Sequence, residues 1–343
     1  MSRRPTITDL AREAGVSTAT VDRVLNGREK VREATARKVY EAAERIGYHA
    51  APLILQRLRS DLPERRLGIL LQKENQEFYQ RFANTFGAKV RACASVRGQP
   101  NIVFARSQDP DEQAELIYEL GQRNHAVAAT AVNHHETTRA VRELYRRNVP
   151  VFALLNDFAQ GLRHSYVGLN NMKIGRMAAW TIYSTGNRAG KVAVFVGGSR
   201  WHGHELRETG FRSYFREQPK RFELLETLVN LETRNVTYEA TLDLLQRHAD
   251  LRGIFVAGGG MEGAIEAVRE RRAPGDVTMV VNELTEISTS ALQDGYVTLI
   301  DSTPLEKLCG TLVEAMLDAA DNGVTDEPRQ IFLQPDIFVP EIL

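Results

Sequence analysis

The 343-residue sequence predicts an α/β protein with a small N-terminal helical unit and a larger body of two doubly wound parallel sheets. Residues 7–48 place apolar side chains three and four positions apart in three stretches, the spacing that buries one face of a helix. From Leu67 onward, short apolar runs alternate with longer amphipathic stretches, which is typical of strands and helices in parallel sheets. About nine such strand-helix units in some 275 residues favour two parallel sheets that lie side by side.

Residues 7–26 are predicted to form two short helices separated by a turn at Gly15. Thr6 or Thr8 can cap the first helix, and Ser17 can cap the second by accepting the free amides of its first turn. The side chains expected to be buried are those of Leu10, Ala11, Ala14, Val16, Val21, Val24 and Leu25. Those left outward on the second helix are Thr18, Ala19, Asp22, Arg23 and Asn26. Small and polar groups around one arginine suit a helix that lies in a DNA groove, although any helical hairpin shares this spacing.

A third helix is predicted over residues 31–48, and Gly47 supplies its C-terminal turn. Its buried stripe consists of Val39, Ala42, Ala43 and Ile46. A linker follows, with Pro52, a short amphipathic piece over residues 53–58 and a polar run that ends at Arg66. We therefore expect a helical domain over residues 1–49, a hinge over 50–66 and a body over 67–343.

The charge of the chain is balanced overall but unevenly distributed. The sequence has 44 basic and 44 acidic residues, whereas residues 1–60 hold 12 Lys and Arg against 7 Asp and Glu. A basic N-terminal unit on an acidic body is typical of a nucleic-acid-binding module joined to another domain.

Several classes of protein are disfavoured by what the sequence lacks. No apolar run approaches the length of a membrane span, and no signal-peptide core precedes the helical hairpin, so the default expectation is a cytoplasmic protein without a membrane partner. Cys93 and Cys309 lie far apart and match no metal-ligand spacing, so neither a metal site nor a disulfide is expected.

The body alternates predicted strands with predicted helices. The strands are residues 67–71, 102–105, 126–129, 149–155, 191–196, 222–225, 254–257, 277–281 and 297–300. Helical spacing is clearest over residues 111–123, 234–249 and 262–272. A ligand is expected at the carboxyl ends of the strands, between the two lobes.

The N-terminal segments 6–17, 19–21, 23–27 and 46–48 together resemble the headpiece of the lactose-repressor (LacI) family. The resemblance implies that the second helix enters the major groove of DNA, with Thr18, Ala19 and Arg23 at base-reading positions. Ser17, Thr20 and Asn26 match phosphate-contacting positions, although Ser17 and Thr20 equally suit a cap and a first-turn residue. An arginine on guanine O6 and N7 contributes roughly 1–3 kcal/mol of base discrimination. Thr6 and Asp22 complete the candidate DNA-binding set of the headpiece.

Two features depart from the family pattern. Asp22 stands where the family usually has serine, and its carboxylate should weaken DNA binding unless it accepts from a cytosine amino group or orients Arg23. Ala50 and Ala51 precede Pro52 where the family has Pro-Asn, so the hinge leucine that wedges into the minor groove is shifted. Leu58 is our first choice for that leucine, and Leu55 is the second.

The body resembles the same family through residues 166–171, 175–176 and 207–211. The fold implied is that of periplasmic sugar-binding proteins, in which the chain crosses between the lobes three times. We expect these crossings near Arg163, near Ser302 and Thr303, and near Arg329.

The candidate effector-binding residues follow the predicted strands and fall where the family binds its effector. They are Phe78, Tyr79, Asn156, Asp157, Trp201, His202, Arg207, Gly259, Glu283 and Ser302. Phe78 and Tyr79 take the place of an aromatic pair that stacks on the effector, Arg207 is the effector-binding arginine, and Asp157 can accept two sugar hydroxyls. Each also has an ordinary structural explanation as a core, cap or loop residue.

The ligand is expected to differ from that of the lactose repressor. Gly258, Gly259 and Gly260 replace the Asn-Asp of the family, and Glu283 replaces an aspartate position. Asp157, Glu283 and Arg207 together offer hydrogen-bond acceptors and donors, which suits a polar, neutral-to-cationic or polyhydroxylated ligand. Helix-terminal amides beside the glycines would instead suit a sugar phosphate.

Two rival functions remain open on the residues alone. Residues 258–263 satisfy G-x-G-x-x-G, and Glu283 follows about 20 residues later, as in an NAD-dependent oxidoreductase. Against this, the pattern lies in the seventh strand-helix unit and lacks a catalytic acid-base pair. The second rival is an interaction protein without DNA specificity. Such a protein would bind DNA weakly, with strong dependence on salt and no preferred palindrome.

The sequence therefore predicts a non-enzymatic transcriptional regulator, by family habit a repressor, that needs no cofactor. It is expected to bind a palindromic operator as a homodimer, or as a tetramer. A small-molecule effector, such as a sugar, polyol or sugar phosphate, is expected to control that binding.

Overall fold

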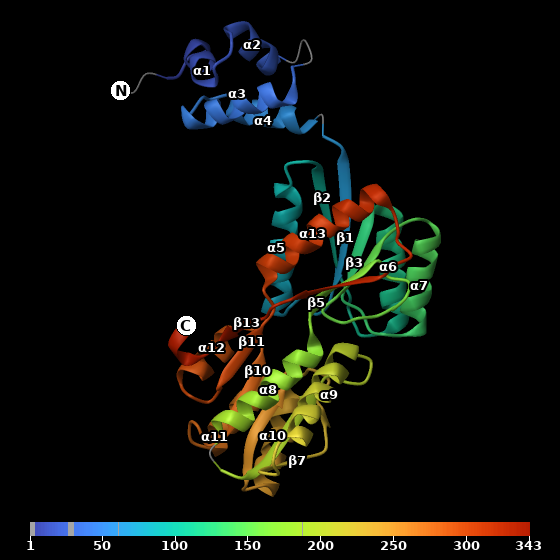
Figure 1. Cartoon of the computed structure of the whole chain (residues 1–343), viewed down its shortest axis with the longest axis vertical. Coiled ribbons are helices and arrows are strands. Elements are labelled where there is room, and N and C mark those ends of the chain that lie inside the picture. The colour runs from blue at the N-terminus through green and yellow to red at the C-terminus, as the bar shows by residue number, and fades with distance from the viewer. Residues whose placement is uncertain (1–3, 27–30, 61, 187) are drawn as a thin grey trace. The chain divides into compact units, whose positions relative to one another are not determined.

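The computed structural model describes residues 4–26, 31–60, 62–186 and 188–343. It has the predicted α/β class: a helical N-terminal unit and two largely parallel sheets (Figure 1). The chain divides into two compact units, one of Met1–Arg65 with Arg91–Gln99 and one of Arg66–Val90 with Pro100–Leu343. Among the described residues, no helix is long and apolar enough to cross a membrane.

The first unit begins with the predicted helical hairpin, α1 (Ile7–Ala14) and α2 (Thr18–Asn26). Thr6 is the N-cap of α1, since its hydroxyl accepts from the Asp9 amide at 3.3 Å and the Asp9 carboxylate accepts from the Thr6 amide at 3.0 Å. Gly15 ends α1 with a left-handed φ of 65°, and Ser17 Oγ accepts from the Thr20 amide at 3.1 Å. Both predicted caps are confirmed.

Two further helices complete this unit: α3 (Glu33–Arg45) and α4 (Ala51–Ser60). The helix α4 is longer than the short amphipathic piece predicted in the linker. Pro52 fits in its first turn, where a missing N–H costs no hydrogen bond. Ala51 and Ile54 are buried with Leu10, Val21 and Val39, so all four helices share one apolar core.

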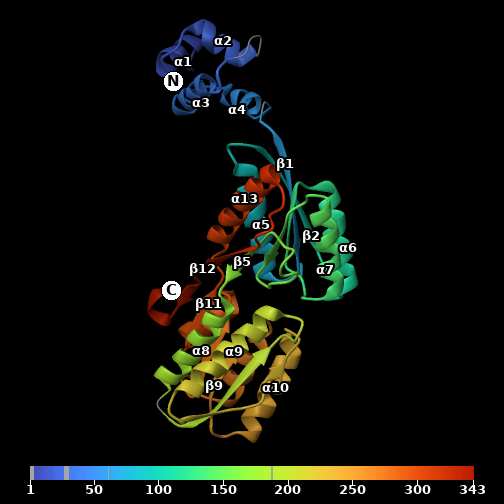
Figure 2. The same cartoon turned by 45° about the vertical axis from the view of Figure 1, so that its right-hand side comes forward.

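The first lobe is a sheet with the strand order β12-β5-β4-β3-β1-β2, and it lies in the second unit except for the first residues of β1 and β2. Its strands are β1 (Glu64–Leu71), β2 (Arg97–Phe104), β3 (Ala126–Ala129), β4 (Val151–Leu154), β5 (Ser165–Leu169) and β12 (Arg329–Leu333). Helices α5 (Glu77–Ala92) and α13 (Leu305–Asn322) lie on one face, and α6 (Pro110–Arg123) and α7 (His135–Arg146) lie on the other (Figure 2). Their apolar faces explain why the central strands are buried on both sides.

The second lobe is a sheet with the order β13-β11-β10-β9-β6-β7, and β8 also pairs with β6. Its strands are β6 (Gly190–Val196), β7 (Phe222–Leu224), β8 (Leu228–Val229), β9 (Leu251–Val256), β10 (Thr278–Asn282), β11 (Leu299–Ser302) and the antiparallel β13 (Asp336–Phe338). Its helices are α8 (Asn171–Thr185), α9 (His202–Glu217), α10 (Arg234–Arg247), α11 (Met261–Arg271) and α12 (Glu286–Gln293), followed by the 3-10 turn Pro340–Ile342.

The chain crosses between the sheets three times, as predicted, but two of the crossings lie elsewhere. It leaves the first lobe after β5, at Asn170, returns after β11, at Thr303, and leaves again after β12, at Gln334. The predicted positions near Arg163 and Arg329 were wrong. The reason is that residues 165–169 and 329–333 pair with each other as parallel strands and extend the first sheet by two strands.

Candidate functional site

The predicted DNA-reading face of α2 is solvent-accessible. Ser17, Thr18, Ala19, Asp22, Arg23 and Asn26 are exposed, whereas Thr6 and Thr20 are half-buried. Gly27, the last residue of the family signature, lies outside the described residues. Asp22 Oδ1 accepts a hydrogen bond from Asn26 Nδ2 at 2.6 Å, so the unusual carboxylate holds a predicted phosphate-contacting side chain.

The two predicted hinge leucines lie on α4. Leu58 is partly buried against the apolar core of the first unit, and Leu55 is half-buried. Leu53, which was not predicted, is the exposed leucine of this helix, at 42%. The structure thus describes Leu58 in packing contact with the helical core.

A cavity of about 410 Å³ lies within the second unit at the carboxyl ends of strands from both lobes. Seven of the predicted effector residues line it: Phe78, Tyr79, Asn156, Trp201, Arg207, Gly259 and Glu283. Phe78 and Tyr79 come from the start of α5 in the first lobe, whereas Arg207 and Glu283 come from the second. The cavity therefore brings together predicted residues from five separate chain segments.

Arg207 is fixed by the close approach of α8 and α9. A side-chain carbon on Gly175 would lie 1.8 Å from the Arg207 carbonyl oxygen, so only glycine allows these helices to meet. In this position Arg207 Nε donates to Asn171 Oδ1 at 2.7 Å, and Nη1 donates to the Ala257 carbonyl at 2.9 Å. Asn171, which was not predicted as a site residue, also lines the cavity.

Glu283 presents a carboxylate that the protein holds in place. Its backbone adopts a left-handed φ of 69°, which is strained for a residue other than glycine. One oxygen accepts from Ser302 Oγ at 2.9 Å and the Thr303 amide at 3.1 Å, and the other accepts from Thr303 Oγ1 at 2.6 Å. Burial raises the pKa of the Glu283 carboxyl above its ordinary value, despite these donors.

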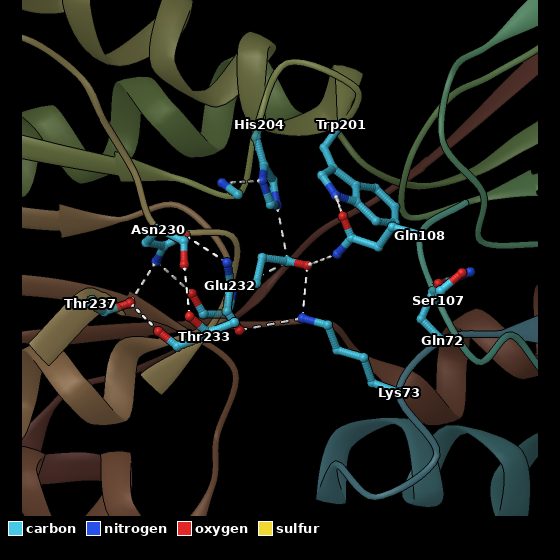
Figure 3. Close-up of polar contacts among 12 residues, drawn as sticks. Gln72, Lys73, Ser107, Gln108, Trp201, His204, Asn230, Glu232, Thr233 and Thr237 are labelled. Atoms are coloured by element: carbon cyan, nitrogen blue, oxygen red, sulfur yellow. Dashed lines mark hydrogen bonds and ion pairs between the residues drawn. The ribbon is translucent and has the colours of Figure 1, made fainter. Parts of the chain in front are cut away.

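Glu232 links the two lobes at one wall of the cavity (Figure 3). Its carboxylate lies 2.9 Å from Lys73 Nζ, which follows β1 in the first lobe. Gln108 of the first lobe approaches the same oxygen at 3.4 Å and accepts from Trp201 Nε1 at 3.2 Å. Burial would raise the pKa of Glu232, but His204 and Lys73 outweigh it and lower the pKa. Since burial also lowers the pKa of His204 to about 4, Lys73 is the cation that acts at neutral pH.

The loop that carries Glu232 is itself shaped by buried polar contacts. Asn230 Oδ1 accepts from the Glu232 amide at 2.9 Å, and Asn230 Nδ2 donates to Thr237 Oγ1 at 3.0 Å and to the Gly259 carbonyl at 2.9 Å. Leu231 and Glu232 both have left-handed backbones, with φ of 52° and 54°. Asn230 therefore holds the strained turn that aims Glu232 at Lys73.

Three predicted effector residues lie outside the cavity, which corrects their expected placement. Asp157 forms a buried ion pair with Arg163, whose Nη2 lies 2.8 Å from Asp157 Oδ2. His202 pairs with Glu205 at 3.4 Å on the first turn of α9, and both Asp157 and His202 border a separate hollow of about 70 Å³. Ser302 does not line the cavity but donates to Glu283.

The cavity also contains residues that the sequence reasoning missed, including His204, Glu232, Asn282 and Thr303. His204 had a usable signal, because it lies three positions before Arg207 and so shares its helix face. Glu232 follows the two-residue strand β8, which is too short to show in the hydrophobic pattern.

The glycines of residues 258–263 have packing explanations. A side-chain carbon on Gly258 would lie 2.5 Å from the His204 ring, and one on Gly263 would lie 2.1 Å from the Arg234 carbonyl oxygen. Gly260 precedes α11 with a left-handed φ of 89°. These close contacts account for the motif without a bound pyrophosphate. Among the described residues, no cluster of His, Cys, Asp or Glu is arranged to hold a metal ion.

Comparisons with known proteins agree with the two parts of the chain. Residues 6–51 match the lacI family of bacterial regulatory proteins, and residues 67–323 match a periplasmic binding protein domain. The transcriptional regulator CelR of Thermobifida fusca is 28% identical over 99% of this chain and 98% of its own length. The transcriptional regulator GalS of Salmonella typhimurium is 24% identical over 92% of this chain and 90% of its own length.

Solved structures resemble the body of the chain. The glucose-galactose binding protein GanP of Geobacillus stearothermophilus superposes with a TM-score of 0.72 at 16% identity, over 81% of this chain and 99% of its own. A solute binding protein of Burkholderia graminis in complex with D-arabinose has a TM-score of 0.74 at 17% identity, over 82% and 97%. At this identity the likeness establishes the fold.

A helix-turn-helix unit followed by a two-lobed binding domain defines a class of protein: the ligand-controlled, DNA-binding transcriptional regulator. The chain belongs to the lacI family of bacterial regulatory proteins. The relatives CelR and GalS are both transcriptional regulators of the helix-turn-helix type.

Proposed function

We propose that this protein is a homodimeric, non-enzymatic repressor whose affinity for a palindromic operator is controlled by a sugar or polyol bound in the cavity. The observation that carries the proposal is the cavity itself. Aromatic side chains from Phe78, Tyr79 and Trp201 line it together with polar side chains, of which Arg207 and Glu283 are held in place by hydrogen bonds. Sites of this composition are typical of small-molecule recognition. The names of the relatives and structural neighbours support a sugar-like ligand.

Each of the three parts of the chain has its own proposed role. Residues 1–49 read DNA, 50–66 form the hinge, and 67–343 bind the effector and form the dimer. One headpiece reads too few base pairs for specificity in a genome, so two copies on a palindrome are required. Binding to chromosomal DNA would place the protein in the cytoplasm.

The proposed switch is a shift between lobe arrangements. An effector that contacts both lobes favours the closed arrangement, and its differential affinity for the two arrangements sets the change in operator affinity. Residues from both lobes line the cavity, including Tyr79 of the first and Arg207 of the second.

Three experiments test this function. Selection of bound sequences from random DNA should return a palindrome, and sedimentation should show a dimer. A thermal-shift screen of sugars, polyols and sugar phosphates should identify compounds that raise the unfolding temperature and change operator affinity.

The variant Arg207→Ala should leave operator affinity unchanged and abolish the effector response, because it removes the guanidinium from the cavity wall. Arg234→Ala is the matched control, since Arg234 pairs with Glu266 on the exposed surface at 2.9 Å. A normal effector response of Arg207→Ala would show that the effector binds elsewhere.

A further inference from the structure

We infer that the effector is an aminated polyol, such as an amino sugar in its cationic form, and that Glu283 selects the amino group. This inference rests on the proposed effector function of the cavity. It goes further by assigning the charge of the ligand and the residue that recognises it.

The charge of the cavity wall favours a cation. Five glutamates line the cavity: Glu77, Glu232, Glu262, Glu283 and Glu286. Lys73 pairs with Glu232, and in the described parts of the chain no ion pair neutralises the other four. Arg207 is the guanidinium among the lining residues, and His204 is neutral at neutral pH because burial lowers its pKa to about 4. A cleft in which one sign of charge is in excess concentrates ligands of the other sign, and here the five glutamates outnumber the guanidinium of Arg207.

Glu283 is the hydrogen-bond acceptor of this wall whose orientation is fixed before a ligand binds. Three hydrogen bonds from Ser302 and Thr303 fix the orientation of its carboxylate, and the strained backbone at φ 69° places it at the cavity surface. A carboxylate that is held before binding costs little ordering when the ligand arrives, and charge-assisted bonds to an ammonium are about twice as strong as neutral ones.

Arg207 is poorly suited to hold an anion here. Its Nε and Nη1 atoms already donate to Asn171 and the Ala257 carbonyl. Because Nε is occupied, the side-on fork of Nε and Nη2 is not available, and an anion is left with the end-on hydrogens of Nη1 and Nη2. A phosphate would therefore meet one guanidinium against four carboxylates that no ion pair neutralises in the described parts of the chain.

Two residues of the cavity wall have polar side-chain atoms without a partner. Asn282 Oδ1 and Thr130 Oγ1 are buried and have no hydrogen-bond partner among the described residues, and both residues line the cavity. Because both atoms are buried, a hydroxyl or ammonium group of a ligand reaches them only if these side chains turn toward the cavity.

Aromatic rings complete a surface for a cationic polyol. Phe78 and Tyr79 lie edge to face with ring centroids 5.1 Å apart, and both line the cavity. Burial and the charges of Glu232 and Glu283 raise the pKa of Tyr79, so its phenol stays neutral and can donate. Ring faces attract cations and accommodate the C–H faces of a sugar.

The experiment titrates the full-length protein, followed by tryptophan fluorescence, with matched compounds. Glucose, galactose and mannose are each compared with the 2-amino sugar, its N-acetyl form and the hexose 6-phosphate. For at least one hexose, the amino sugar should bind about tenfold more tightly than both the parent and the N-acetyl form. The 6-phosphate should bind more weakly than the parent.

The variant Glu283→Gln should remove most of this amino preference, measured as the ratio of the affinities for the amino sugar and the parent hexose. Glu266→Gln, on the exposed surface of α11, is the matched control and should change neither value. If Glu283→Gln unfolds, ionic strength supplies the same information: salt should weaken binding of the amino sugar but not of the parent hexose.

The outcomes separate this inference from the proposed function. Binding of a parent hexose or a 6-phosphate that changes operator affinity, without an amino preference, overturns the inference and leaves the proposed function standing. An amino preference that persists in Glu283→Gln overturns the role of Glu283. If no compound binds, both the inference and the sugar effector of the proposed function fail.

Discussion

Asp22 carries the clearest single-residue prediction on the DNA-reading face. Its carboxylate accepts from Asn26 Nδ2 at 2.6 Å and brings a negative charge toward the phosphates that α2 is proposed to approach. Asp22→Ser should free Asn26 and remove the repulsion, which should tighten operator binding several-fold and relax its base preference. Fluorescence anisotropy on the selected operator and its single-base variants measures both effects.

The control for this prediction is Asp22→Asn, which removes the charge but retains a side chain that can bond to Asn26. An increase in affinity for both variants would assign the effect to charge. If neither variant changes affinity or base preference, Asp22 is only a solvated residue at the edge of the helix.

Asp301 gives a pH-dependent prediction. Burial raises its pKa to about 7 from an ordinary value near 3.8, so the folded protein binds a proton that the unfolded chain releases. Stability from this group is present below pH 4 and is lost as pH rises to 7, an effect of order 4 kcal/mol. Asp301→Asn should therefore raise the unfolding temperature at pH 8 more than at pH 5.

The variant must be compared with the wild type at each pH, because the titration of His204 changes stability with pH in the opposite direction. Its pKa of about 4 means that stability is lost as pH falls below about 6.5. Asp336→Asn, at an exposed position on β13, is the control. An equal gain at pH 5 and pH 8 would rule out the titration of Asp301 as the cause.

Single residues also show what the sequence could and could not predict. Trp201 was predicted in the cavity because it follows a strand, whereas Arg207 and Tyr79 were also indicated by the family resemblance. Asp157 follows a strand in the same way, but its carboxylate is used by Arg163. An ion pair formed in the interior depends on the folded path between its partners, and no local pattern reveals it.

At the scale of elements, α4 is an integral helix of the first unit rather than a loosely held linker. Ile54 is fully buried in the shared core, whereas Leu53 is 42% exposed. Ile54→Ala should destabilise the first unit by about 2–5 kcal/mol, because it leaves a cavity among packed side chains. Amide exchange of α1, α3 and α4 should become faster, with little change in the two-lobed body.

Leu53→Ala, one position away on the same helix, is the matched control and should leave exchange nearly unchanged. If Ile54→Ala exchanges like Leu53→Ala, then α4 does not contribute to the core of this unit in solution.

The elements that were predicted correctly are those with local signals. Caps at Thr6 and Ser17, the turn at Gly15 and the helix predicted over residues 111–123 all follow from neighbouring residues. The strand β5 was instead not predicted, because its role depends on pairing with β12 more than 160 residues away. Such pairing leaves no trace in a local window of sequence.

At the scale of the whole molecule, the contact between Lys73 and Glu232 predicts how the lobes respond to mutation. This ion pair joins the two lobes with both side chains largely buried, at 25% and 12% exposure. Lys73→Met should leave Glu232 without its cation, favour separated lobes and weaken effector binding several-fold, or by about 1 kcal/mol. Titration with the compound found in the screen measures the affinity, and small-angle scattering measures the expansion.

Lys89→Met is the control, since Lys89 pairs with Glu306 at the same 2.9 Å but within one lobe. Equal effects of the two substitutions would show that the inter-lobe ion pair has no special part in closure.

The bilobal architecture was predicted from the alternation of strands and helices, and the number of such units required two sheets. The sequence did not predict which individual strands belong to which sheet. The last two strands, β12 and β13, go to different lobes although only two residues separate them. That partition depends on which sheet edge is still open late in the chain, a property of the assembled fold.

The three crossings between lobes have a consequence for folding during translation. β11 contributes to the second sheet, whereas α13 and β12 return to the first, so both lobes await residues from the last part of the chain. Until Arg329–Leu333 emerges from the ribosome, β5 has an open edge, and until Asp336–Phe338 emerges, β11 does too. The helical unit needs only the first 60 residues, so it can acquire its fold while the body is still being translated.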